Sequence, residues 1–211
     1  PAMLQGLDED TAEDLTRRLV AAKAPLLVTG YGGRTAEHRH AIVELAETLQ
    51  IPITEYRGRF SAPLEHELHL GFNPERWVGD ADLILVVDHD VPFVPADRPL
   101  RDDVQLIHLG ADPIQEDLLV WGFPADEVIK CNVLSALRAL GRSAKKAVDA
   151  ISSEERDRLS ARGDQARRHH DHLMSELEAQ EATPGANAIT PFMVGRTLSK
   201  LCPVTQVYEG T

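Results

Sequence analysis

The chain has 211 residues, of which 43% are hydrophobic, and it carries 22 Lys and Arg against 34 Asp and Glu. This apolar fraction is enough to build a core and excludes disorder throughout, while the net charge of −12 argues against binding to nucleic acid or to an anionic membrane surface. No apolar run approaches the ~18 to 20 residues of a transmembrane helix, and the acidic segment 1–11 is unlike a signal peptide, so we expect a cytoplasmic protein.

The first quarter of the chain predicts two strands joined by a glycine turn and a helix. Residues 11–22 have the apolar spacing of a helix, and the short apolar run 26–29 reads as a strand buried on both faces. The turn Gly30-Tyr31-Gly32-Gly33 follows, and Thr35 caps a helix that leads to a second strand at 51–54. A connection of this length favours parallel strands with a right-handed crossover.

Three more strands are predicted farther along the chain. They occupy residues 83–87, 104–109 and 127–130, after a long loop over 55–72. A helix over residues 132–140 follows, with Gly141 as its stop. Short apolar strands that alternate with helices predict an α/β fold: a doubly wound, mostly parallel sheet of five to six strands with helices on both faces.

Charge and turn residues divide the chain into three predicted parts. Residues 1–141 form a central Rossmann-like domain that we expect to fold without the rest. Residues 142–188 form a charged helical linker, solvated on most sides, that breaks at 183–186, and residues 189–211 begin a further domain with a helix and a strand at 204–208. The chain opens at Pro1 rather than Met, so we expect a piece of a longer protein.

The glycine turn is the first candidate binding element. Gly30, Gly32 and Gly33 stand between a strand and a helix, where a dinucleotide-binding fold places its phosphate turn. The third glycine of that pattern is missing because position 35 is Thr, so a purely structural turn remains the alternative. Glu55 follows the second strand, about where a ribose-binding acid stands, although a solvated loop carboxylate fits the pattern better.

Two aspartates are the second candidate element. Asp88 and Asp112 each follow a strand at its carboxyl end, the edge at which open sheets bind ligands. If the strand order reverses between 26–29 and 83–87, Gly30 and both aspartates converge there. An aspartate in such a position is also a common turn residue and helix cap, so a structural role is equally open.

Histidines and cysteines provide little sign of a metal site. The pair His66-x-x-His69 and the cluster His169-His170-Asp171-His172 each lack a further ligand at suitable spacing, and we expect both to be solvated. Cys131 and Cys202 form no Cys-x-x-Cys pair, so we expect two buried free thiols.

Taken in order, these segments resemble the central domain of thiamine diphosphate-dependent enzymes, the group that includes acetohydroxyacid synthase, pyruvate oxidase, benzoylformate decarboxylase and oxalyl-CoA decarboxylase. The resemblance rests on Ala24-Pro25-Leu26-Leu27-Val28-Thr29-Gly30, Leu45-Ala46-Glu47, Ile51-Pro52-Ile53, Leu70-Gly71-Phe72, Ala81-Asp82-Leu83-Ile84-Leu85-Val86-Val87 and Ile107-His108-Leu109-Gly110-Ala111-Asp112-Pro113. Beyond the linker, Ile189-Thr190-Pro191 and the segment 201–210 look like the opening of the family's third, pyrophosphate-binding domain.

The resemblance implies an enzyme that acts on a 2-oxo acid or a related substrate, by decarboxylation or carboligation. In the family a first domain supplies the glutamate that activates thiamine diphosphate, and a third supplies a Gly-Asp-Gly…Asn motif for magnesium and diphosphate. Neither motif is present, since Gly79-Asp80-Ala81 lacks the last glycine. We therefore expect an inactive, structural piece that needs the missing N-terminal and C-terminal domains, in a parent enzyme that forms a dimer or tetramer.

Some family members bind the ADP portion of FAD, or another nucleotide, on this domain. The expected binding residues here are Gly30, Gly32, Gly33, Asp88 and Asp112, but the Asp88 carboxylate stands where the family often has Gly and would repel a diphosphate, so we expect FAD to bind weakly or not at all. Two alternatives to the thiamine enzyme remain: a stand-alone FAD- or NAD-binding module of the electron-transfer flavoprotein or sirtuin type, and a dimerisation module.

Overall fold

The computed structural model of the chain describes residues 4–56, 60–94, 99–115, 123–182, 189 and 191–201. The chain divides into two compact units, Pro1–His170 and Asp171–Thr211. The predicted break at 183–186, the predicted strand at 204–208 and Cys202 lie outside the described residues.

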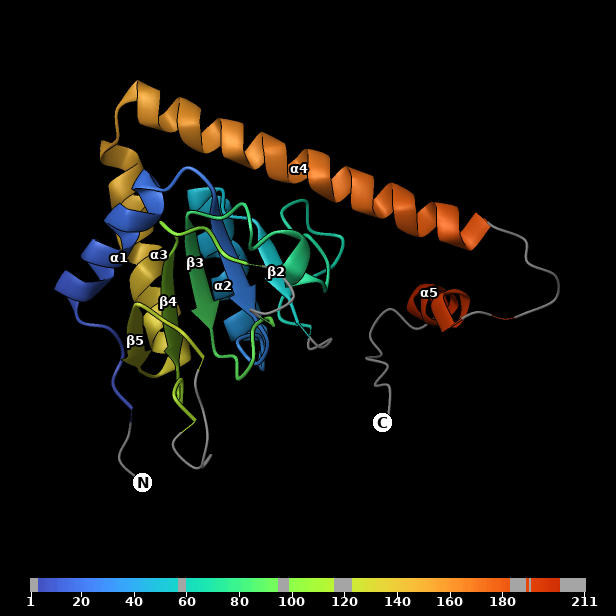
Figure 1. Cartoon of the computed structure of the whole chain (residues 1–211), viewed down its shortest axis with the longest axis horizontal. Coiled ribbons are helices and arrows are strands. Elements are labelled where there is room, and N and C mark those ends of the chain that lie inside the picture. Colours follow the sequence, from blue (N-terminus) through green and yellow to red (C-terminus); the bar gives the residue numbers. More distant parts are fainter. Residues whose placement is uncertain are drawn as a thin grey trace. The chain divides into compact units, whose positions relative to one another are not determined.

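The first unit is built on a sheet that has five strands within the described residues, and every strand pair is parallel (Figure 1). The strand order is β2-β1-β3-β4-β5, which reverses between β1 and β3 as the nucleotide hypothesis requires. The predicted α/β fold with a parallel sheet is confirmed, and the reversal of strand order is that of a doubly wound sheet. The strands are β1 (Pro25–Thr29), β2 (Ile53–Glu55), β3 (Leu83–Val87), β4 (Gln105–Gly110) and β5 (Glu127–Lys130).

A short extended segment lies along the outer edge of β2. The backbone N–H of Ile53 donates to the carbonyl of Leu68 at 2.8 Å, and the N–H of Leu70 donates to the carbonyl of Ile53 at 2.7 Å. His69, between them, forms an isolated parallel bridge with Ile53. The loop predicted over residues 55–72 therefore ends in a segment that pairs with the sheet.

Three helices of the first unit begin at side-chain caps. They are α1 (Glu9–Ala21), α2 (Ala36–Leu49) and α3 (Val133–Ala150). The caps Asp8, Thr35 and Asn132 accept backbone N–H groups of the first helical turn at 2.7, 3.4 and 3.0 Å. The predicted cap at Thr35 is confirmed, whereas α1 begins at Glu9 rather than at residue 11.

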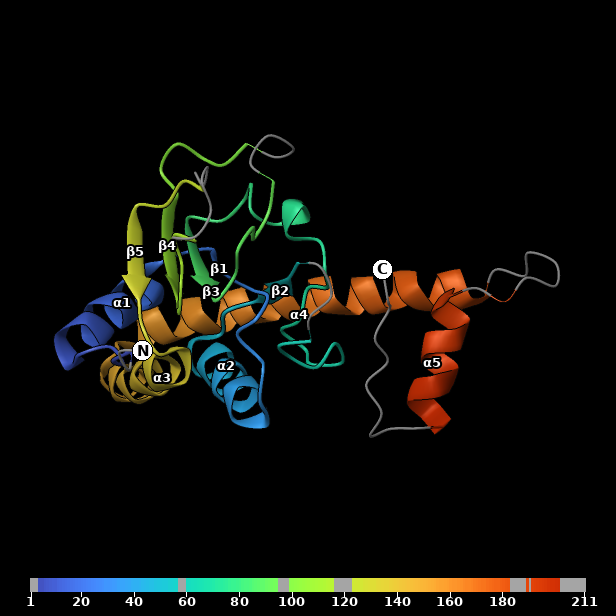
Figure 2. The same ribbon diagram turned by 90° about the horizontal axis from the view of Figure 1, so that it is seen from below.

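Two apolar clusters pack on the two faces of the sheet. Leu27 and Leu85 point into the larger cluster, which also holds residues of α1, α2 and α3. Val28 and Ile84 point into the second cluster, where Phe93 and other loop residues cover them. Figure 2 shows α1, α2 and α3 together on one side of the strands. Helices were expected on both faces; in the described residues the second face is covered by loops and the short 3₁₀-helix η1 (Pro74–Arg76).

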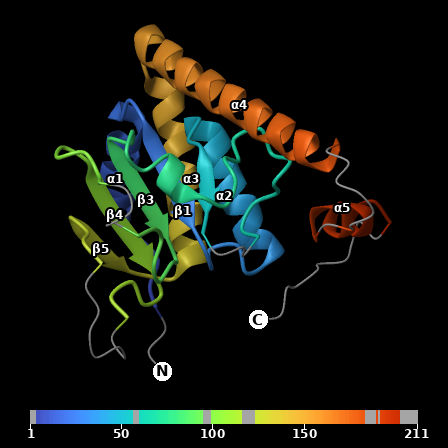
Figure 3. The same cartoon turned by 45° about the vertical axis from the view of Figure 1, so that its right-hand side comes forward.

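Helix α3 does not stop at Gly141, so that prediction is wrong. The helix continues unbroken to Ala150 (Figure 3). Its apolar period continues as well, because Leu140 and Ala144 are buried and Val148 packs against the same cluster. Burial of this face outweighs the ~1 kcal/mol by which a glycine weakens a helix interior.

Helix α4 (Ser153–Ala182) lies in the predicted charged linker, and one stripe of its first half is buried. Leu159 and Ala166 are buried in the larger cluster, and Arg162 and His170 are also buried. Residues 153–170 therefore belong to the first unit. The sequence pattern does not reveal this buried stripe, because two of its members, Arg162 and His170, are polar residues that are usually exposed. The predicted domain boundary at residue 141 stays a prediction.

Arg162 is buried because it is surrounded by backbone carbonyls. Its Nε donates to the carbonyl of Leu49 at 3.0 Å, and its Nη1 donates to those of Leu19 and Ala22 at 2.9 and 2.8 Å. Burial lowers the pKa of Arg162 to about 10, and the nearby charge of Arg158 adds to this effect. The group stays protonated at neutral pH and remains a full hydrogen-bond donor.

The second unit contains the end of α4 and α5 (Pro191–Leu201), where a helix was predicted. The side chain of His172 lies 3.4 Å from that of Glu176, one turn later in α4. Met193, Val194 and Leu201 of α5 are exposed. Across the described ranges, every helix is too short or too polar to cross a bilayer.

Candidate functional site

The candidate residues meet at the carboxyl edge of the sheet, between the ends of β1 and β3. The backbone N–H of Tyr31 donates to the carbonyl of Asp88 at 2.8 Å, which joins the glycine turn to the end of β3. The N–H of Ala111 donates to Oδ1 of Asp88 at 3.3 Å. The predicted convergence of Gly30 and Asp88 is thus observed. On the side of Asp112, the hydrogen bond to Asp88 comes from the neighbouring residue, Ala111.

The Asp88 carboxylate is already engaged inside the protein. Its side chain is 9% exposed and forms an ion pair with Arg34, which follows the glycine turn. The backbone of Asp88 adopts the left-handed conformation (φ 49°), which aspartate tolerates better than most residues. Asp88 therefore holds the end of β3 against the turn and against Ala111.

Close packing explains all three glycines. A Cβ at Gly30 would lie 2.6 Å from the ring of His89, and a Cβ at Gly33 would lie 2.2 Å from the Cα of Ser61. The backbone N–H of Gly33 donates to Oγ of Ser61 at 3.2 Å. A Cβ at Gly32 would lie 2.5 Å from Oγ1 of Thr29. Side chains of the protein itself therefore fill the space next to the turn.

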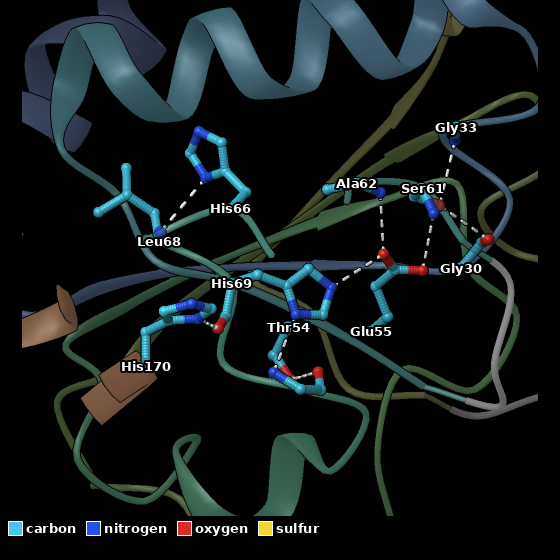
Figure 4. Close-up of polar contacts among 11 residues, drawn as sticks. Gly30, Gly33, Thr54, Glu55, Ser61, Ala62, His66, Leu68, His69 and His170 are labelled. Carbon is cyan, nitrogen blue, oxygen red and sulfur yellow. Dashed lines mark hydrogen bonds and ion pairs between the residues drawn. The ribbon is translucent and has the colours of Figure 1, made fainter. Parts of the chain in front are cut away.

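Glu55 lies at the centre of a buried polar network (Figure 4). Its carboxylate accepts the backbone N–H groups of Ser61 at 2.8 Å and Ala62 at 2.9 Å, and its Oε1 lies 3.1 Å from Nε2 of His69. The Glu55 and His69 side chains are both fully buried. The prediction of a solvated loop carboxylate is wrong, because the segment 60–62 folds over the end of β2.

The hydrogen bonds of His69 assign its tautomer. The N–H of Gly71 donates to Nδ1 of His69 at 3.0 Å, so Nδ1 is the acceptor and Nε2 carries the proton that faces Glu55. The carbonyl of His69 lies 2.8 Å from Nδ1 of His170 on α4. His69 and His170 are buried, so the prediction that both histidine clusters are solvated is wrong at these positions. In the described part of the chain, no three His, Cys, Asp or Glu side chains are placed to hold a metal ion.

His108 is a further buried imidazole, on β4 and on the second face of the sheet. It is 1% exposed and its ring lies 6.4 Å from that of Phe123. Burial lowers the pKa of His108 to about 4, against a smaller opposing effect from a hydrogen bond with the backbone of His89. At neutral pH His108 is therefore uncharged.

Sequence reasoning missed Ser61, which carries no pattern that separates it from other loop serines. An indirect signal is the glycine at position 33, whose close neighbour is Ser61. A role of Gly30, Gly32, Gly33, Asp88 and Asp112 in binding a nucleotide stays a prediction.

Comparison with known proteins identifies the family to which the chain belongs. Residues 12–140 match the family described as thiamine pyrophosphate enzyme, central domain. No curated protein matches the chain. The fold is similar to that of benzoylformate decarboxylase from Polynucleobacter necessarius, with 22% identity and a TM-score of 0.52 over 67% of this chain and 28% of that one.

A second solved structure with the same fold is the thiamine diphosphate-dependent 4-hydroxybenzoylformate decarboxylase of Rhodococcus jostii. It is 22% identical, with a TM-score of 0.53 over 72% of this chain and 29% of that one. The chain thus spans less than a third of the length of the solved proteins that it resembles. Because the family match covers more than half of the chain, the chain belongs to the family of thiamine pyrophosphate enzyme central domains.

Proposed function

We propose that the chain is the central domain of a thiamine diphosphate-dependent enzyme that acts on a 2-oxo acid or a related substrate, by decarboxylation or carboligation. The observation that carries this proposal is the family match over residues 12–140. The two solved proteins of the same fold support it, because both are named as decarboxylases of aryl 2-oxo acids.

The described residues do not fit thiamine diphosphate and magnesium. The diphosphate is held through a metal ion, and no group of three suitable ligands is present in the described ranges. Asp80, in the pair Gly79-Asp80, lies in an exposed turn before β3, at the amino edge of the sheet. In this proposal the cofactor and its metal are held by flanking domains, and this chain supplies the scaffold that connects them.

The remaining parts of the proposal concern the parent protein. It would contain an N-terminal and a further C-terminal domain, and it would form a homo-oligomer in the cytoplasm. The alternative of a stand-alone nucleotide-binding or dimerisation module is disfavoured by the family match and by the side chains that fill the glycine turn.

Calorimetric titration tests the assignment of the cofactor site. The 211-residue chain is titrated with thiamine diphosphate in the presence of Mg²⁺, and we expect no saturable heat. Saturable micromolar binding would contradict the proposal, because the chain would then hold the cofactor with its own residues.

A further inference from the structure

The hydroxyl of Ser61 lies inside the glycine turn. Its Oγ accepts the backbone N–H of Gly33 at 3.2 Å and donates to the carbonyl of Gly30 at 3.0 Å. Ser61 is 1% exposed. One serine therefore satisfies both a donor of the turn, the Gly33 N–H, and an acceptor, the Gly30 carbonyl. Without Ser61, the Gly33 N–H would be free to donate to an oxygen of a ligand.

Glu55 holds Ser61 in this position. Its carboxylate accepts two consecutive backbone N–H groups, from Ser61 and Ala62, at 2.8 and 2.9 Å. Hydrogen bonds to a carboxylate are about twice as strong as those between neutral groups. The third donor, Nε2 of His69 at 3.1 Å, fixes the carboxylate from the other side.

The same chain of contacts reaches α4. Nδ1 of His170 lies 2.8 Å from the carbonyl of His69, within hydrogen-bond distance. Figure 4 shows His170, His69, Glu55 and Ser61 in one line from the helix to the turn. His170 is the last residue of the first unit, so the network begins where α4 leaves that unit.

We infer that Ser61 closes the glycine turn to phosphate, and that Glu55, His69 and His170 are positioning residues that keep it closed. Geometry supports this inference, because Oγ of Ser61 already accepts the Gly33 N–H at 3.2 Å, in the place that a phosphate oxygen would take as acceptor. Charge supports it as well, because the buried Glu55 carboxylate would repel a diphosphate. Ser61 is thus the residue that decides which ligands the turn excludes.

Amide hydrogen exchange of the whole chain, measured by NMR, tests the closed turn. In Ser61→Ala the Gly33 N–H loses its acceptor, and we expect it to exchange at least about tenfold faster. In Glu55→Gln the amide of Ser61 should exchange faster by a similar factor, because the remaining side-chain oxygen can still accept from Ala62 and His69 whereas the NH₂ group cannot accept from Ser61. Unchanged exchange in either variant, with a cooperative melt retained, would overturn the inference.

The role of His170 is tested against a matched control on the same helix. His170→Ala should speed exchange of Ser61 and Ala62 and alter the ¹⁵N shifts of the His69 ring, which report its tautomer. His172→Ala removes an exposed imidazole two residues later and should leave both unchanged. If the two variants had equal effects, or if His170→Ala had none, the positioning role of His170 would be contradicted.

Titration with ADP tests the exclusion itself. In the natural sequence we expect millimolar ADP to leave the amide resonances of Gly30, Gly32 and Gly33 unchanged. Saturable ADP-dependent shifts of these resonances would overturn the inference, because they would show that phosphate enters the turn despite Ser61.

Discussion

Nε of Arg162 donates to the backbone carbonyl of Leu49, the last residue of α2, at 3.0 Å. The same guanidinium reaches the carbonyls of Leu19 and Ala22 at the end of α1. These carbonyls have no partner inside their own helices, so one side chain caps two helix ends. A helix that reads as a linker in the sequence is therefore part of the central fold.

Replacing Arg162 with Met should lower the free energy of unfolding by about 2 to 4 kcal/mol, because the apolar stem remains while three carbonyls lose their donor. Urea unfolding followed by circular dichroism measures the change. Arg168→Met is the matched control, because Arg168 is an exposed residue of the same helix, and it should change stability by less than ~0.5 kcal/mol. Equal stability of the two variants would contradict the capping role of Arg162.

Truncation distinguishes the predicted domain end from the observed packing. A chain that ends at residue 141 loses the buried Ala144 of α3 and the buried residues of α4, whereas a chain that ends at residue 182 keeps both. We expect a cooperative thermal transition for both chains, at a lower temperature for 1–141 than for 1–182. If 1–141 melted cooperatively at the same temperature, the packing of α4 would be dispensable.

Acid should destabilise the protein through His108. An unfolded histidine binds a proton near pH 6.5, whereas burial lowers the pKa of the folded His108 ring to about 4. Protons therefore favour the unfolded state between these values. The contribution of His108 is complete above pH 6.5 and is lost as the pH falls to 4, by up to ~3 kcal/mol.

Urea unfolding of His108→Gln across this pH range measures that contribution. The variant should lose less stability on acidification than the natural sequence, whereas His172→Gln, at an exposed position, should follow the natural sequence. Parallel stability curves for the natural sequence and His108→Gln would show that the ring is not the titrating group.

Cys131 should be inert in the folded protein. It is 1% exposed, and burial raises the pKa of its thiol to about 11, so almost no thiolate is present at pH 8. In a Cys202→Ser background, a thiol reagent such as DTNB should react only after urea is added. Rapid stoichiometric reaction without urea would contradict the buried position of Cys131.

The strands could be predicted because each is a local pattern. Residues 26–29 and 83–87 are apolar runs between turn signals, and these runs form the two central strands at the switch point. Thr35 was identified as a cap because a cap depends on residues within one helical turn. The meeting of Gly30 with Asp88 followed from parallel strand order alone.

The remaining features depend on contacts between residues far apart in the chain. Arg162 caps Leu19 from 143 positions away, and no local pattern distinguishes it from a solvated arginine. Glu55 and Ser61 are close in sequence, but their contact requires the loop after β2 to fold back over its end. The predicted helix end at Gly141 was wrong because the cost of a glycine inside a helix is small compared with the free energy gained by burying an entire helix face.

The activity of the full-length protein that contains these 211 residues tests the central claim most directly. Release of CO₂ from benzoylformate and other 2-oxo acids is measured with and without thiamine diphosphate and Mg²⁺, for that protein and for the 211-residue chain. We predict release by the full-length protein only when both cofactors are present, and none by the chain alone. Release that does not depend on thiamine diphosphate, or release by the chain alone, would contradict the assignment.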